Sequence, residues 1–149
     1  MKAPTPTIVL DAAIFVAAAR GRSSGAIIEA QRNAVLVTTD RVVQEARRRI
    51  ELGLKRPELL AIIDALTNAM TVVPVATLTP LMARSETSLR EAVASRNGST
   101  KDAHVLALAW DADADIWTTD RDFAGTGVAT WSTPNLMRRL AEAVSDRAS

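Results

Sequence analysis

The sequence predicts an α/β fold in which helices cover both faces of a central parallel sheet. Short apolar runs, such as 7–10 and 34–37, alternate with longer segments whose apolar residues recur at helical spacing. The run 34–37 is apolar at every position, which is typical of a strand buried on both faces. The chain has 149 residues, 48% of them hydrophobic, and this is enough for one well-packed domain. We expect one domain over 1–149, with a loose lead-in at 1–6 and a loose tail at 145–149.

Capping and turn residues give the order of the elements. Many of the predicted helices begin at a Ser, Thr, Asp or Pro, or end at a Gly, as helix termini commonly do. A proline cannot donate to a sheet ladder, so the strand that contains Pro74 is expected at the sheet edge. Gly125 and Gly127 indicate a turn before the last strand. Strands are expected at 7–10, 34–37, 71–75, 115–119 and 128–131, and helices at 12–19, 23–32, 40–53, 57–66, 79–95, 102–110 and 134–144.

Composition excludes several classes of protein. There is no cysteine, so the chain has no disulfide framework, no thiolate zinc site and no cysteine nucleophile. The apolar stretch 8–19 resembles a signal peptide, but Asp11 interrupts it, and no run reaches the about 18 apolar residues of a membrane helix. We therefore expect a cytoplasmic protein with no membrane association. The formal net charge of +1 neither favours nor excludes nucleic-acid binding.

Four acidic residues, Asp11, Glu45, Asp102 and Asp120, are placed at or near the ends of predicted elements. Asp11 and Asp120 each follow a strand, and the carboxyl ends of parallel strands form the edge at which ligands bind. Carboxylates gathered at one edge repel one another unless a cation neutralises them. Carboxylate oxygens without thiolates are typical ligands of Mg²⁺ or Mn²⁺. The sequence therefore predicts a divalent metal site at this edge.

Three of the four acids also have a purely structural explanation. Glu45 lies one helical turn before Arg49, which allows an i,i+4 ion pair. Asp102 precedes the apolar run 105–110, where an acid in the first helical turn favours the helix dipole. Asp11 has the weakest structural explanation, because an acid that ends a buried strand costs free energy unless it is exposed or paired. It is the order of the acids along the chain that favours a common site.

Other polar residues are weaker candidates. His104 lies two residues from Asp102, so a helix turns it away from that acid. Asp111, Asp113 and Asp115, together with Asp122, mimic the spacing of a calcium loop. Ile116 stands where that loop requires glycine, so these acids are expected to end a helix and turn the chain.

Basic and aromatic residues are also open to two explanations. A basic cluster on a helix is usually solvated, and it also favours contact with RNA phosphates. Tryptophans in apolar segments are expected in the core. The candidate RNA contacts are Arg47, Arg48, Lys55 and Arg56, and the predicted core tryptophans are Trp110, Trp117 and Trp131.

The ordered acids resemble the PIN-domain nuclease family, and within it the bacterial VapC-like toxins. The resemblance spans 8–136 and rests on the strand that leads into Asp11, on Glu45 within 42–46, on Asp102 within 99–103, and on Thr118-Thr119-Asp120-Arg121-Asp122-Phe123. It implies a PIN-like three-layer sandwich with a central five-stranded parallel sheet flanked by helices. One departure is Ala13, which stands where the family usually has Ser, Thr or Asn.

The resemblance also implies the activity, the roles and the partners. It implies a Mg²⁺- or Mn²⁺-dependent endoribonuclease with RNA as its substrate. Asp11, Asp102 and Asp120 are then the metal ligands, Glu45 completes the catalytic set, and Thr118 and Asp122 support it. A small VapB-like antitoxin would bind the toxin, which would form a homodimer. Two alternatives remain: a non-catalytic PIN-like interaction module, and a phosphoacceptor receiver domain. The receiver domain is disfavoured because Ala12 and Ala13, rather than a second acid, follow Asp11.

Overall fold

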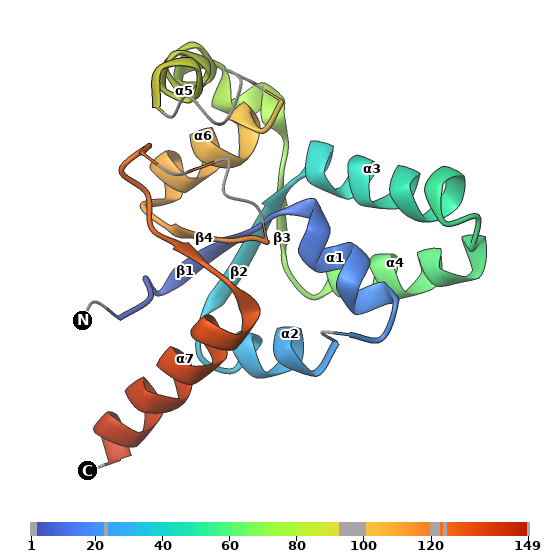
Figure 1. Ribbon diagram of the computed structural model, residues 1–149, viewed down its shortest axis with the longest axis vertical. Helices are drawn as coiled ribbons and strands as arrows, with labels where there is room; N and C mark the ends of the chain where they lie inside the picture. Colours follow the sequence, from blue (N-terminus) through green and yellow to red (C-terminus); the bar gives the residue numbers. More distant parts are fainter. Residues whose placement is uncertain (1–2, 23, 93–100, 120–122, 124, 149) are drawn as a thin grey trace.

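The protein folds around a five-stranded sheet in which every strand pairs in parallel with its neighbours (Figure 1). The computed structural model describes residues 3–22, 24–92, 101–119, 123 and 125–148. The strand order is β3-β2-β1-β4-β5, so the first strand of the chain lies at the centre of the sheet. The strands are β1 (Thr7–Leu10), β2 (Val35–Thr39), β3 (Thr71–Val73), β4 (Asp115–Trp117) and β5 (Thr130–Trp131).

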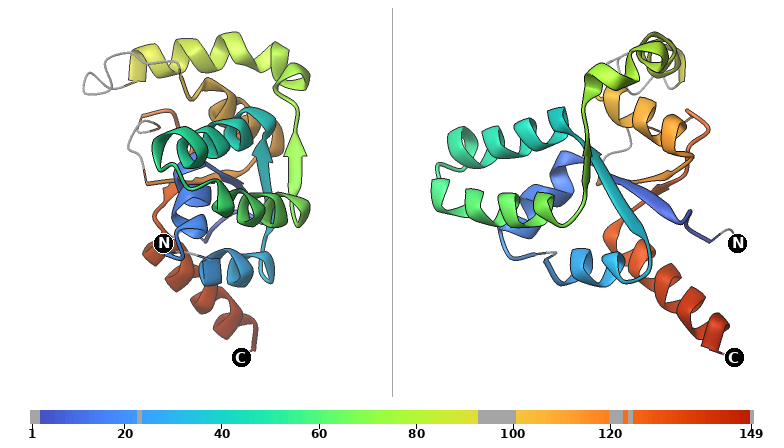
Figure 2. Two further views of the ribbon diagram at one scale, coloured as in Figure 1. Left: turned by 90° about the vertical axis from the view of Figure 1, so that its right-hand side faces the viewer. Right: turned by 180° about the vertical axis from the view of Figure 1, so that it is seen from behind.

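Helices cover both faces of the sheet, as the apolar runs predict. In Figures 1 and 2, α5 and α6 lie on one side of the sheet, and α1, α3 and α4 pack together on the other. The helix α7 contacts α2 and extends away from the sheet toward the C-terminus. The α-helices are α1 (Ala12–Ala19), α2 (Ser24–Gln31), α3 (Asp40–Arg48), α4 (Leu60–Asn68), α5 (Thr79–Ala92), α6 (Ala103–Ala112) and α7 (Thr133–Ala148). A π-helical segment (Arg49–Gly53) continues α3, and 3-10 turns (Pro57–Leu59 and Val75–Leu78) precede α4 and α5.

The core lies where α6 crosses the central strands. All residues of 103–109 in α6 are buried, and this helix packs against β1, β2 and β4. In β1, Ile8, Val9 and Leu10 are 0% exposed, as expected for a strand covered on both faces. The two elements that carry Asp11 and Asp102 at their ends are therefore fixed against each other by the main core.

The predicted order of strands and helices is confirmed, with shifts at element ends. The strand with Pro74 does lie at the sheet edge, but it ends at Val73, because Pro74 has no N–H to donate. The second strand continues beyond the apolar run to Thr39. The predicted strands 115–119 and 128–131 are each shorter, at Asp115–Trp117 and Thr130–Trp131.

Both ends of the described chain have defined local structure. The backbone N–H of Thr5 donates to Asp115 Oδ2 at 3.2 Å, and Asp115 N–H donates back to Thr5 Oγ1 at 2.8 Å, so the lead-in is anchored to β4. At the other end, α7 extends beyond the predicted helix end at residue 144, to Ala148. No Pro or Gly follows Pro134, so nothing in the local sequence stops the helix earlier.

In the part of the chain that the structure describes, none of the helices is both long enough and apolar enough to cross a membrane.

Candidate functional site

The candidate site lies at the carboxyl ends of β1 and β4. From the central strand β1, the chain adds β2 and β3 toward one edge of the sheet. It later adds β4 and β5 toward the other edge, so the direction of strand addition reverses between β1 and β4. Ligands of open parallel sheets bind in the crevice at such a switch point. Asp11 follows β1, and Thr118 follows β4, which pairs with β1 at Leu10 and Trp117. The Asp11 N–H extends this pairing by donating to Trp117 O at 3.1 Å.

The structure brings Asp11 and Thr118 into direct contact. Thr118 Oγ1 donates to Asp11 Oδ2 at 2.8 Å, and the N–H of Ala12 donates to Asp11 Oδ1 at 2.8 Å. Asp11 is only 3% exposed and Thr118 is equally buried. Asp11 is also the N-cap residue of α1, where the helix dipole favours the ionised carboxylate. The predicted supporting role of Thr118 thus has a geometric basis, because its hydroxyl fixes the orientation of the carboxylate.

Glu45 lies on α3, which begins next to the same edge of the sheet. Its Oε1 is 2.7 Å from Arg49 Nη2 and 3.5 Å from Lys101 Nζ, and its side chain is 17% exposed. The ion pair with Arg49 is the structural role that the i,i+4 spacing predicts. The contact with Lys101 is long-range and places Glu45 beside the start of α6. Glu45 also lines a pocket of about 360 Å³ together with Arg41, Arg48 and His104.

Asp102 opens α6, but not in the predicted way. It is the N-cap residue with φ −100° and ψ 18°, and the helix itself begins at Ala103, so Asp102 is not an acid of the first turn. Its side chain makes no capping hydrogen bond to the helix. The Asp102 side chain therefore does not cap the helix, and its neighbour Lys101 forms an ion pair with Glu45.

His104 is a buried residue whose tertiary contact the sequence does not reveal. It is 1% exposed, and its Nδ1 lies 2.8 Å from Oγ1 of Thr39, the N-cap residue of α3. Burial is the main cause that lowers the pKa of His104 to about 4, with a further contribution from the positive charge of Arg41. The ring is thus neutral at pH 7 and links the start of α6 to the start of α3. Its apolar neighbours in the sequence indicate burial, but only the folded chain supplies Thr39.

The four predicted RNA-contacting residues have different surroundings in the structure. Arg47 forms an ion pair with Asp64, and Arg56 pairs with Glu58 at 3.0 Å. Lys55 has a left-handed φ of 55° and is exposed. Only Arg48 of this set lines the pocket that contains Glu45. Arg41, which we did not single out from the sequence, lines it too.

The structure does not test the whole metal-binding set. Asp120 and Asp122 lie outside the described residues, and no group of three or more His, Asp or Glu side chains within the described part is arranged to hold a metal ion. The chemistry of the donors near the switch point nevertheless fits a hard cation, because Asp11 and Thr118 supply oxygen atoms. The roles of Asp11, Asp102 and Asp120 as ligands therefore stay predictions.

Asp113, Asp115 and the three tryptophans contribute to the fold. Asp113 ends α6 in a left-handed conformation with φ 50°, and Asp115 Oδ2 accepts from Trp131 Nε1 at 2.8 Å, so these acids turn and anchor the chain as expected. Trp117 is 0% exposed, which confirms its place in the core. Trp110 and Trp131 are only partly buried against the core.

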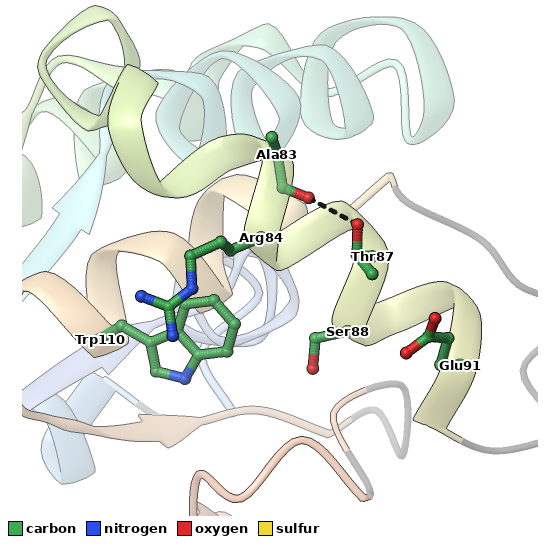
Figure 3. A pocket seen from close by; sticks show the side chains of 6 residues that line it. All are labelled: Ala83, Arg84, Thr87, Ser88, Glu91 and Trp110. Atoms are coloured by element: carbon green, nitrogen blue, oxygen red, sulfur yellow. Dashed lines mark hydrogen bonds between the residues drawn. The ribbon is translucent and has the colours of Figure 1, made fainter.

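A second, larger pocket lies away from the candidate site residues. It has a volume of about 510 Å³ between α5 and α6, and none of the predicted acids lines it. Figure 3 shows Arg84 stacked over Trp110 there, with 5.4 Å between the guanidinium carbon and the ring centroid. This cation–π contact joins the two helices and gives the pocket a structural explanation.

One protein-family model matches most of the chain. The model described as PIN domain matches residues 9–141, a range that includes every candidate catalytic residue. A search of curated protein sequences found no match.

Solved structures with the same fold include proteins from bacteria and an archaeon. The structure of VapBC2 from Rickettsia felis, bound to a DNA fragment from their promoter, matches with a TM-score of 0.67 and 14% identity, over 85% of this chain and 98% of that one. PAE2754 from Pyrobaculum aerophilum matches with a TM-score of 0.61 and 17% identity, over 91% and 96% of the two chains. VapC20 from Mycobacterium tuberculosis, a sarcin-ricin loop cleaving toxin, matches with a TM-score of 0.62 and 18% identity, over 82% and 96%. At these identities the likeness is one of fold.

Proposed function

The chain belongs to the PIN domain family, and from this premise we propose that it is a divalent-metal-dependent endoribonuclease and the toxin of a VapC-like toxin–antitoxin pair. The observation that carries the proposal is the buried Asp11 carboxylate, oriented by Thr118 at the switch point of the parallel sheet. A carboxylate buried at a ligand-binding edge is costly for stability alone, which supports a functional role.

The proposed division of labour follows from where each side chain lies. Asp11, Asp102 and Asp120 would hold Mg²⁺ or Mn²⁺, and Thr118 would keep the Asp11 oxygens in one orientation. When bound, such an ion lowers the pKa of water and neutralises the charge that develops on the phosphodiester. Glu45 is held by Arg49 and Lys101, so its contact with the metal site would run through water or follow exchange of one ion pair. Asp122 would be a supporting acid.

The proposed partners are RNA, a small VapB-like antitoxin and a second copy of the chain. Two of the solved structures with this fold are a VapBC complex and a toxin that cleaves the sarcin-ricin loop, which supports the toxin assignment by analogy of fold. A cytoplasmic location, where both RNA and an antitoxin are found, is part of the same proposal.

RNA cleavage by the purified chain tests the proposal directly. We expect cleavage of single-stranded RNA in Mn²⁺ or Mg²⁺, no cleavage in EDTA, and loss of cleavage in Asp102→Asn. Asp64→Asn, an exposed acid that pairs with Arg47, is the matched control and should cleave like the wild type. Cleavage that persists in EDTA, or in Asp102→Asn, would contradict the metal mechanism.

Two observations favour the non-catalytic interaction module as a second candidate. The Glu45 carboxylate already contacts two cationic side chains, and Ala13 replaces a polar residue usual in the family. An interaction module would bind its partner protein without cutting RNA under any metal condition. Expression of the wild type and of Asp120→Asn in a bacterial host separates the two candidates, because only a catalytic toxin loses growth arrest with the acid.

A further inference from the structure

A basic pocket lies beside Glu45 and the start of α6. It is lined on one side by α3, through Arg41, Gln44 and Arg48, and on the other by Lys101 and His104. Arg41 and Gln44 also line a second hollow of about 430 Å³ that extends toward Val75 and Met82. The two hollows thus share Arg41 and Gln44 on α3, and Asp40 also lines the second one.

The cations of this pocket are not all used by the fold. Arg41 and Arg48 are exposed, and neither forms an ion pair with any residue in the described part of the chain. Their neighbours Arg47 and Arg49 differ, because each pairs with an acid. Two guanidinium groups that line one pocket and form no ion pair favour a bound anion, and phosphate is an anion that the guanidinium geometry fits.

The buried ring of His104 supplies a hydrogen-bond donor for the same anion, as its bond with Thr39 indicates. Thr39 Oγ1 accepts from Val42 N–H at 3.0 Å and lies 2.8 Å from His104 Nδ1. We assign the Thr39 hydroxyl as the donor in the second bond, since the opposite direction would leave its proton without an acceptor among the described residues. Nδ1 is then the acceptor and Nε2 carries the proton of the neutral ring.

Nε2 of His104 is left for a ligand. The pocket is lined by His104, although the residue is only 1% exposed. Nε2 has no hydrogen-bond partner in the described part of the chain, where the single buried side-chain polar atom without one is Arg139 Nη2. Nε2–H is therefore not sealed in the core and is a fixed donor at the wall of a basic pocket.

We propose that this pocket binds a backbone phosphate of single-stranded RNA next to the cleaved bond, with Arg41 and Arg48 as cationic contacts and His104 Nε2–H as a hydrogen-bond donor. The inference rests on the proposed endoribonuclease function and assigns the path of its substrate. The shared hollow beyond Gln44 would receive the adjoining nucleotide. The RNA strand would thus cross the exposed face of α3 on its way past Glu45.

Binding of a fluorescently labelled single-stranded RNA oligonucleotide of mixed sequence, measured by anisotropy in EDTA, tests the pocket without cleavage. Arg41→Ala and Arg48→Ala should each weaken binding about tenfold, the size of one lost charge-assisted contact. Each should also reduce the slope of log affinity against log salt by about 0.7, as expected for one phosphate contact to a single strand. Arg32→Ala is the matched control, because Arg32 is exposed on the C-terminal side of α2 and pairs with Glu29.

Two substitutions of His104 separate a ligand contact from a structural role. His104→Gln keeps an N–H near the position of Nε2 and loses the acceptor near Nδ1, whereas His104→Asn keeps a polar group near Nδ1 and loses the outer donor. The proposal predicts that the Gln variant binds RNA more tightly than the Asn variant, even if it is the less stable of the two in thermal melting. The opposite order of RNA affinity, or wild-type affinity and salt slope in both arginine variants, would overturn it.

The outcome is independent of the nuclease assignment. Weakened binding in Arg41→Ala, Arg48→Ala and His104→Asn supports the pocket even if the wild type cuts no RNA. If cleavage requires Asp11 and Asp102 while the pocket variants bind and cut RNA like the wild type, the pocket assignment fails and the nuclease assignment stands.

Discussion

Thr39 and His104 join the first residues of two helices through one buried hydrogen bond of 2.8 Å. Thr39 caps α3, which carries Glu45, and His104 lies in the first turn of α6, which Asp102 opens. Both residues are almost completely buried. The bond therefore fixes the separation of two helices that each bring an acid toward the candidate site.

The first prediction concerns a substitution that removes this hydrogen bond. Thr39→Val leaves both His104 Nδ1 and the Val42 N–H without their partner, and a buried polar group left unsatisfied costs about 1–3 kcal/mol. We expect the free energy of unfolding, measured by urea denaturation, to fall by that amount. Thr39→Ser keeps the hydroxyl and should recover most of the loss. If the Ser variant is as unstable as the Val variant, the hydrogen bond is not what stabilises this position.

The second prediction concerns pH. The pKa of His104 is lowered to about 4 in the folded protein from the ordinary histidine value of 6.5, so below pH 6.5 the unfolded chain binds a proton that the folded chain does not. His104 should therefore destabilise the fold as the pH falls from about 6.5 to 4, by up to about 3 kcal/mol in total. His104→Gln lacks this titration. Urea denaturation across that range should show a flatter pH dependence for the variant, and parallel curves would contradict the lowered pKa.

The third prediction concerns the contact between Thr118 and Asp11. Thr118→Val removes the hydroxyl that orients the carboxylate, and loss of such an orienting partner typically lowers metal affinity or activity about 10- to 100-fold. We expect RNA cleavage to fall by this factor, with a higher Mn²⁺ concentration needed for half-maximal rate. Thr118→Ser should retain cleavage. Equal activity in the Val and Ser variants would remove Thr118 from the site.

The fourth prediction tests Asp120, which lies outside the described residues. If Asp120 is a metal ligand crowded by other carboxylates, Asp120→Asn should be at least as stable as the wild type in EDTA. Excess Mn²⁺ should stabilise the wild type by mass action, about 2.7 kcal/mol at a hundred times the dissociation constant, and the variant by less. Thermal melting of both proteins in EDTA and in Mn²⁺ measures this. A variant that melts well below the wild type in EDTA and gains equally from Mn²⁺ would make Asp120 structural.

Patterns local in the sequence predicted most of the fold. The apolar runs at 7–10 and 34–37 and the edge position of the Pro74 strand depend on burial and on missing N–H groups, which a sequence displays directly. Element ends were less predictable, because Thr39 continues its strand and caps a helix at once. The anchoring of Thr5 by Asp115 was unpredictable, since it joins residues that only the folded sheet brings together.

The candidate site was also predictable only where it depends on local sequence. Asp11 could be recognised from the sequence, because an acid directly after a buried strand costs free energy unless it is exposed or paired. The ion pair of Glu45 with Arg49 followed from helical spacing, but its contact with Lys101 did not, because that contact depends on how α6 packs beside α3. Arg41 and Arg48 became distinguishable from Arg47 only when the structure placed Asp64 beside Arg47.

The contact between Asp11 and Thr118 also bears on when activity can arise during protein synthesis. The two residues are 107 positions apart, whereas β1 pairs with β2 over a much shorter stretch, such as Ile8 with Leu36. Domains begin to fold from the N-terminus while the ribosome is still adding residues. A nascent chain can thus form the β1–β2 half of the sheet early, but it lacks the residue that orients Asp11 until most of the sequence has been translated. For a chain that we propose to be toxic, this order means that incomplete translation products would be inactive.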